Sequence, residues 1–473
     1  MMFDKLKPRW SHILVTLVLL VIISPTPIPQ PMVTPIRSAI VALESGRPDS
    51  ALGFLETALA FEPTLEGLHT QAAEIALAAG EPLAALDHLE AENSLAPPDT
   101  TQACLRSRAL LTIGNTAEAA NIWKEVNGTC PKPAQFLQDL AQAYLVEGDL
   151  TAAQSILEEL AFIDPANPDI RVSLALVTAT ITPERAIQHL RLANELNPYG
   201  NSLALNLIRV IENARPADDR SYSLAQVGQT LARHGEWTSA VWAFLHALDL
   251  NPEYIEARAY LGLALDRAGQ DGLKELKAAV NAAPTAALPH IFLALHWQAQ
   301  NQPERARQQL EVAAHLDPTN PAVAAELGAA YTALGDIRPA IAAFRLATEL
   351  APKDPRFWLL LAQFSTANEI EVQTLGLPAA RNALALNPDD PAALDILGYA
   401  HLLLGNLRLA DRLLWRAVNL EPCRAASQFH LGLLRQAQGD LIRARAGLEM
   451  AIQLDRGGPF GQLAERVLVH IHP

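Results

Sequence analysis

The sequence predicts an all-α solenoid, and three observations lead to that prediction. Prolines that follow helical runs recur at intervals of 34 residues, or close to it, along most of the 473-residue chain. Glycines recur about midway between successive prolines. Half of the residues are apolar and 18% are charged, so the chain can bury a long core and is not mainly disordered. A fixed period of this length indicates helix–turn–helix units that stack, because one unit cannot bury its apolar face alone.

Each unit is expected to contain two helices, and the recurring prolines mark the end of the second one. These prolines are Pro63, Pro97, Pro131, Pro165, Pro198, Pro252, Pro284, Pro318, Pro352, Pro388 and Pro422. A glycine such as Gly335 suits the turn between the helices, because it can adopt a positive φ. Small residues such as Gly328 and Ala340 let the two helices approach closely, and a large residue such as Phe344 fills the remaining space.

This pattern resembles the tetratricopeptide repeat family. One unit matches the family pattern nearly completely, with Leu327, Gly328, Tyr331, Ala340, Phe344, Ala347 and Pro352. The resemblance extends over about 10–12 units, from Met32 to about Gly458. It implies a right-handed superhelical solenoid of helix–turn–helix repeats, here preceded by an N-terminal hydrophobic segment.

Departures from the period predict the domain boundaries. The gap from Pro198 to Pro252 is 54 residues, one unit plus twenty, which indicates an extra helix or a degenerate half-unit. We therefore expect the following parts: an N-terminal signal or anchor segment with a proline-rich spacer at 1–31, a first repeat block at 32–200, a joint at 201–220, a second repeat block at 221–458, and a C-terminal capping helix at 459–473.

The N-terminal segment has the layout of a secretion signal. Lys5, Lys7 and Arg9 precede a largely apolar run from Trp10 to Ile23, and a proline-rich stretch follows. Such a run gives about 21 Å of helix, short of the roughly 30 Å hydrocarbon core, so it is marginal as a membrane-spanning helix. We expect an uncleaved single-pass anchor with the solenoid on the extracytoplasmic side. One alternative is secretion after cleavage of the signal. Another is that the segment is buried in the fold or results from a wrongly assigned start of the chain.

Charge and cysteine content exclude several classes of function. A net charge of −15 repels phosphate backbones, so we expect no nucleic-acid binding. Three cysteines cannot build a disulfide framework or a four-cysteine zinc site. Cys104 and Cys130 fall at the start and end of one unit, where antiparallel packing brings helix ends together. A disulfide between them is feasible if the solenoid is exported, and two unpaired buried thiols are the alternative.

No catalytic signature is present, and the segments outside the repeats are too short for a separate catalytic domain. We therefore expect no enzyme activity, cofactor or small-molecule ligand. His290 and His296 lie near His315, but six residues along one helix place the first two rings on different faces. No metal site is predicted from these histidines.

The family resemblance implies that the first helices of successive units line a concave groove that takes a peptide. In the last five units the groove-facing positions are mostly apolar, and no unit carries the lysine and asparagine pair with which some family members clamp an acidic C-terminus. The predicted partner-binding residues are Leu288, Ile291, Leu295, Leu359, Tyr399, Leu402, Phe429 and Leu433. The alternative is that the superhelix or a flanking segment covers this stripe.

One face of a second helix carries three arginines, Arg408, Arg412 and Arg416. This face can bind an anionic partner or a lipid head group, or it can simply be exposed to solvent. Together these features favour a non-catalytic scaffold that binds protein or peptide partners and is anchored to, or exported across, a membrane. The alternatives are a self-assembling structural component of the cell envelope, or an accessory subunit of an envelope or polysaccharide pathway.

Overall fold

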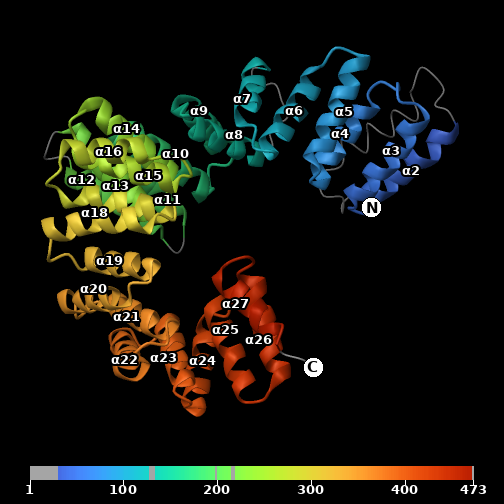
Figure 1. The fold of residues 1–473 in the computed structure, drawn as a ribbon. Helices are drawn as coiled ribbons and strands as arrows, with labels where there is room; N and C mark the ends of the chain where they lie inside the picture. The colour runs from blue at the N-terminus through green and yellow to red at the C-terminus, as the bar shows by residue number, and fades with distance from the viewer. Residues whose placement is uncertain (1–29, 127–133, 198–199, 215–218, 471–473) are drawn as a thin grey trace. The chain divides into compact units, whose positions relative to one another are not determined.

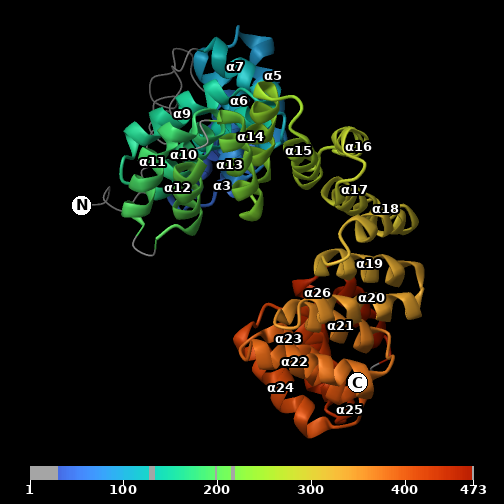
Figure 2. The ribbon, with the colours of Figure 1, turned by 90° about the vertical axis from the view of Figure 1, so that its left-hand side faces the viewer.

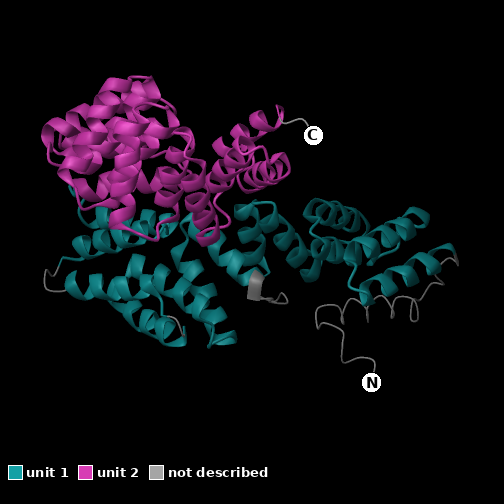
Figure 3. Ribbon diagram, turned by 90° about the horizontal axis from the view of Figure 1, so that it is seen from below, with its two compact units in different colours: residues 1–254 teal, residues 255–473 magenta. Residues whose placement is uncertain are grey.

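The computed structural model describes residues 30–126, 134–197, 200–214 and 219–470. Over these ranges the regular structure consists of helices and contains no strand (Figure 1). The chain divides into two compact units, residues 1–254 and 255–473, which are coloured separately in Figure 3. Each unit is described by itself below. The all-α repeat architecture predicted from the sequence is confirmed.

In the first unit, consecutive helices pack in pairs and α12 (Ser202–Ala214) stands alone between two of them. The pairs are α2 (Gln30–Glu44) with α3 (Pro48–Phe61), α4 (Leu68–Ala79) with α5 (Pro82–Leu95), α6 (Thr100–Thr112) with α7 (Thr116–Glu125), α8 (Ala134–Glu147) with α9 (Leu150–Ile163), α10 (Pro168–Ile181) with α11 (Pro183–Leu196), and α13 (Arg220–Arg233) with α14 (Trp237–Leu250).

The second unit continues the same pairing (Figure 2). It ends with α27 (Pro459–Leu468), which packs on α26 (Figure 1). Its pairs are α15 (Ile255–Arg267) with α16 (Leu273–Ala282), α17 (Ala287–Ala299) with α18 (Pro303–Leu316), α19 (Pro321–Leu334) with α20 (Ile337–Leu350), α21 (Pro355–Ala367) with α22 (Leu377–Leu386), α23 (Pro391–Leu403) with α24 (Leu407–Leu420), and α25 (Ala425–Ala437) with α26 (Leu441–Leu454). A π-helical segment, η2 (Val372–Gly376), leads into α22.

The helices of a pair are held together by a small residue facing a large one. A Cβ built on Gly328 in α19 would lie 2.9 Å from the ring of Phe344 in α20. Ala340 is fully buried, and Phe344 is 5% exposed. The ring therefore contacts the backbone of the facing helix, as the spacing of these residues predicts.

The turns between repeats use two prolines for different purposes. The sequence pattern places one proline after each second helix, and the structure shows that another begins the next first helix in several repeats. The residue before that second proline accepts a backbone N–H of the new helix with its side chain. Asn167, Asn320, Asp354 and Asp390 all do so. Proline is tolerated at this first helical position, because its missing N–H would have no partner there.

A recurring hydrogen bond links each such turn to the next first helix. The carbonyl of the inter-repeat proline accepts from the side chain six residues later in five repeats of the described chain, over 2.9–3.4 Å. The donors are His69, Arg171, His290, Trp358 and Gln428. Each of these prolines lies two residues beyond the end of a second helix, so its carbonyl is outside the helical hydrogen bonds, and this bond satisfies it and ties the turn to the next first helix.

His69 and His290 hold the same position in their repeats but have different second partners. The Nδ1 atom of His69 lies 3.1 Å from Nδ1 of His88, whereas Nδ1 of His290 lies 2.8 Å from the side-chain amide of Gln309. Burial lowers the pKa of His88, and His69 lowers it further, while Glu56 and Asp87 partly oppose these effects. The fold therefore favours the neutral form of His88.

This difference predicts a pH-dependent effect of His88→Gln, which would reproduce the His290–Gln309 pair. A lowered pKa means that the unfolded chain binds the proton more readily, so the contribution of His88 is intact above the ordinary imidazole pKa of about 6.5 and is lost below it. When the pH is lowered from about 7.5 to about 5, the melting temperature of the variant should fall by a few degrees less than that of the wild type. Equal losses in the two proteins, measured by circular dichroism, would contradict the assignment.

Three predictions from the sequence concern particular segments. Residues 202–214 of the predicted joint form α12, which packs between α11 and α13 inside the first unit, and the predicted capping segment contains α27. The block boundaries themselves stay a prediction. The predicted signal or anchor, residues 1–29, lies outside the described residues. Among the helices that are described, none has the length and apolar character needed to cross a membrane.

Candidate functional site

The predicted partner-binding residues lie on the first helices of four repeats in the second unit, α17, α21, α23 and α25. Their side chains are half-buried, except for Phe429, which is 5% exposed. Leu288, Ile291 and Leu295 pack at the edge of a core cluster that includes Phe292 and Trp297. Each of these leucine and isoleucine side chains thus shares its surface between the core and solvent. Their role in binding stays a prediction.

The row of first-helix residues is more covered toward the C-terminus. Tyr399 stacks on His430, with ring centroids 4.0 Å apart and an interplanar angle of 12°. Burial raises the pKa of Tyr399, and the charges of Glu369 and Asp395 raise it further. Phe429 belongs to a cluster with Leu448 of α26, and partly buried residues of α27 pack against that cluster. At this end Phe429 is therefore covered, whereas Tyr399, Leu402 and Leu433 stay half-buried.

Earlier in the row, exposed alanines lie between half-buried leucines. Ala322 and Ala329 of α19 are exposed, and their methyl groups leave room above the helix. Leu295 of α17 and Leu359 of α21 are half-buried at the neighbouring first helices. An apolar segment laid across α17, α19 and α21 would contact leucines on both sides of an alanine-rich floor.

A second candidate surface is a cleft on α24. Its volume is about 540 Å³, and its lining residues are Asp411, Arg412, Trp415, Arg416 and Arg435. Trp415 is 61% exposed. Arg435 contacts Asp411 at 2.8 Å and Arg416 contacts Asp389 at 2.6 Å, whereas Arg412 forms no ion pair with the described residues. The cleft can therefore offer Arg412 to an anionic group beside an indole face.

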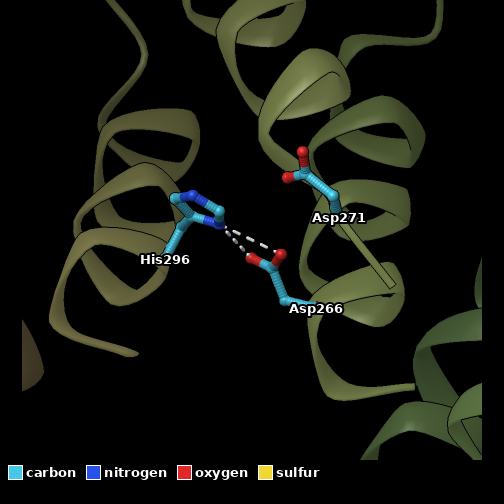
Figure 4. Close-up of side chains that lie close together, drawn as sticks. All are labelled: Asp266, Asp271 and His296. Atoms are coloured by element: carbon cyan, nitrogen blue, oxygen red, sulfur yellow. Dashed lines mark hydrogen bonds and ion pairs between the residues drawn. The ribbon is translucent and has the colours of Figure 1, made fainter. Parts of the chain in front are cut away.

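A cluster of possible metal ligands lies at the start of the second unit (Figure 4). Asp266 is at the end of α15, Asp271 is in the turn before α16, and His296 is in α17. The Nδ1 atom of His296 lies 3.0 and 2.9 Å from the two carboxylate oxygens of Asp266. One ligand atom from each of the three residues lies within 4.8 Å of the others.

The sequence did not predict His296 as a ligand, because His290, six residues away on the same helix, lies on a different face. The structure supplies the partners from the preceding repeat. A usable signal was the register of the repeats, since Asp266 and His296 both lie in the last turns of successive first helices, α15 and α17, which are in contact.

The predicted disulfide can be followed for one of its two cysteines. Cys104 is buried in α6, and Cys130 lies outside the described residues. The pairing stays a prediction. Cys423, in the turn before α25, is a free and exposed thiol.

Comparisons with known proteins concern the repeats. Residues 298–364, from α17 to α21, match the family model of the tetratricopeptide repeat. No curated protein matches the chain. Among solved structures, the chain is similar to the APC/C hetero-tetramer Cut9–Hcn1, with 16% identity, coverage of 96% of this chain and 98% of that one, and a TM-score of 0.45.

Two further solved structures are similar to the chain. Yeast Tom70 has 14% identity and a TM-score of 0.40, and the match covers 93% of this chain and 96% of that one. MamA of Desulfovibrio magneticus RS-1, residues 41 to the end, has 22% identity and a TM-score of 0.32, and the match covers 36% of this chain and 96% of that one.

Proposed function

Because residues 298–364 match the tetratricopeptide repeat model and helix pairs recur along the described chain, we propose that the protein is a non-catalytic tetratricopeptide repeat scaffold. It binds an apolar segment of a partner protein across α17, α19 and α21. The observation that carries the proposal is the row of half-buried leucines and isoleucine on these first helices, separated by exposed alanines. Solenoids present extended surfaces of this kind, and an apolar helix or extended strand is the ligand that fits them.

Partial burial of the row has an energetic consequence. Each leucine is already positioned by its contacts with the core, so little side-chain entropy is lost when a partner covers the remaining exposed part. Apolar area contributes about 25 cal/mol per Å² removed from water, and screening of charges by salt does not weaken this contribution. The proposed binding is therefore driven by the burial of apolar area and by the fit between the two surfaces.

The first test replaces two leucines on this surface. We expect Leu295→Gln with Leu359→Gln to weaken binding by about 2 kcal/mol in total, because two apolar anchors are lost. The ligand for this test is a peptide selected from a random library on the immobilised full chain, and fluorescence anisotropy measures its affinity. Raising the salt concentration should change the wild-type affinity little.

The matched control places the same substitutions on second helices. Leu316→Gln in α18 and Leu346→Gln in α20 remove leucines that are 38% and 43% exposed on the second helices of two repeats. This control should keep the wild-type affinity, and circular dichroism should show that both double variants remain folded. If the control loses as much affinity as the test variant, the first-helix surface is not the binding site.

We also propose that the N-terminal segment holds the solenoid at the extracytoplasmic side of a membrane. Support comes from the basic residues, the apolar run from Trp10 to Ile23 and the proline-rich stretch that follows. Deleting residues 1–30 is expected to move the protein from the membrane fraction to the soluble fraction, because the segment supplies the apolar contact with lipid. Retention of the truncated chain on salt-washed membranes would reject this location, and immunoblotting of the fractions measures it.

A further inference from the structure

We propose that Asp266, Asp271 and His296 bind one divalent transition-metal cation that joins the α15–α16 turn to α17. The donor set is one imidazole nitrogen and two carboxylates. Figure 4 shows the three side chains extending from different segments toward a shared space. Ligands bonded to a metal at about 2.0–2.2 Å are roughly 3 Å apart, which is the separation already present between His296 and Asp266.

The charges of the cluster favour a cation. In the described part of the chain, neither Asp266 nor Asp271 forms an ion pair with lysine or arginine, and His296 is the one basic side chain paired with Asp266. The side chain of Asp266 is only 14% exposed and that of His296 4% exposed. Two carboxylates this close repel each other unless a positive charge lies between them, and a dication supplies it.

A second aspartate–histidine pair in the same unit shows which feature distinguishes the proposed metal site. His430 contacts Asp395 at 3.0 Å, and their side chains are 5% and 0% exposed. No third ligand group lies within ligand distance of that pair among the described residues. An aspartate–histidine contact alone is therefore a structural contact, whereas Asp271 adds a second carboxylate and, being exposed, a path from solvent.

The turn that carries Asp271 also orients both carboxylates. The backbone N–H of Gly272 donates to Asp266 over 2.9 Å, and the N–H of Leu273 donates to Asp271 over 2.9 Å. Hydrogen bonds of this kind hold the ligands of metal sites in place. The cluster thus needs only a small movement of the Asp271 side chain to close around an ion.

The donor set selects the class of metal. Imidazole nitrogen with carboxylate oxygen suits Zn²⁺ or Mn²⁺, whereas Ca²⁺ prefers six or more oxygen ligands. Three protein ligands leave at least one position for water. A metal is bound by the neutral ring, so in the loaded site His296 would coordinate through Nδ1 and carry its one hydrogen on Nε2.

The test is calorimetric titration of the full chain, without a histidine tag, with ZnCl₂. Asp271→Asn is the main variant, because the residue is exposed and the amide oxygen can still accept from Leu273, so folding is preserved. We expect one equivalent of Zn²⁺ to bind the wild type and its affinity to fall about tenfold or more in the variant. Zn²⁺ should raise the wild-type melting temperature, and Ca²⁺ at the same concentration should not.

Asp440→Asn is the matched control, since Asp440 lies in the equivalent turn before α26 and accepts from the N–H of Arg443 over 3.1 Å. It should bind Zn²⁺ as the wild type does. His296→Asn retains a donor toward Asp266 but removes the imidazole ligand, so it should lose the same equivalent of Zn²⁺. Unchanged Zn²⁺ affinity in Asp271→Asn, or an equal loss in Asp440→Asn, would overturn the proposal.

Discussion

Replacing Gly272 by alanine is expected to destabilise the second unit by about 3 kcal/mol or more. The added Cβ would lie 2.0 Å from the carbonyl oxygen of Gly262, an atom of the α15 backbone that cannot rotate away. A Cβ on Gly262 would in turn lie 2.5 Å from Leu276. The pair α15–α16 must therefore separate to accept one methyl group, and overpacking of this kind is costly.

Gly53→Ala is the control with the opposite expected sign. Gly53 lies inside α3, and nothing is within 4 Å of a Cβ built there. The alanine should stabilise the first unit by about 0.5–1 kcal/mol, because glycine lowers helix propensity. Hydrogen exchange measures each effect locally, since a solenoid can unfold in parts. Full protection of residues 255–299 in Gly272→Ala would show that the contact is not as close as described.

The packing inside a repeat could be predicted from the sequence because the same solution recurs. Gly328 facing Phe344, and Gly335 with its φ of +79° at the turn, follow from the spacing alone. Each position is constrained by neighbours within one repeat, and many copies show the same constraint. Local information is therefore enough to identify the fold.

Contacts between repeats could not be predicted in the same way. Phe429 occupies a position that the family resemblance assigns to the groove, yet it is buried, and so is Asp395 on the neighbouring first helix. Their burial depends on how closely α23, α25 and α27 pack at the end of the unit, and the repeat pattern does not encode that packing. The Asp266–His296 contact likewise joins residues 30 positions apart, from different repeats.

The buried aspartate–histidine pair of α23 and α25 leads to the second large expected effect. His430→Ala should destabilise the second unit by about 3 kcal/mol or more, because it leaves the fully buried carboxylate of Asp395 without its partner. The change also removes the ring that stacks on Tyr399 and meets Phe460 edge-on, with centroids 5.8 Å apart. Chemical denaturation followed by circular dichroism measures the change in free energy of unfolding.

His430→Asn separates the hydrogen bond from the lost ring. The amide nitrogen of asparagine occupies nearly the place of Nδ1, so it can still donate to Asp395, while both variants lose the stacking on Tyr399. If the unpaired carboxylate dominates, asparagine recovers more than half of the stability that alanine loses, since an unsatisfied buried charge costs more than the missing ring contacts. Equal destabilisation by the two substitutions would instead assign the effect to the ring, and the pair would then be a packing contact with no electrostatic share.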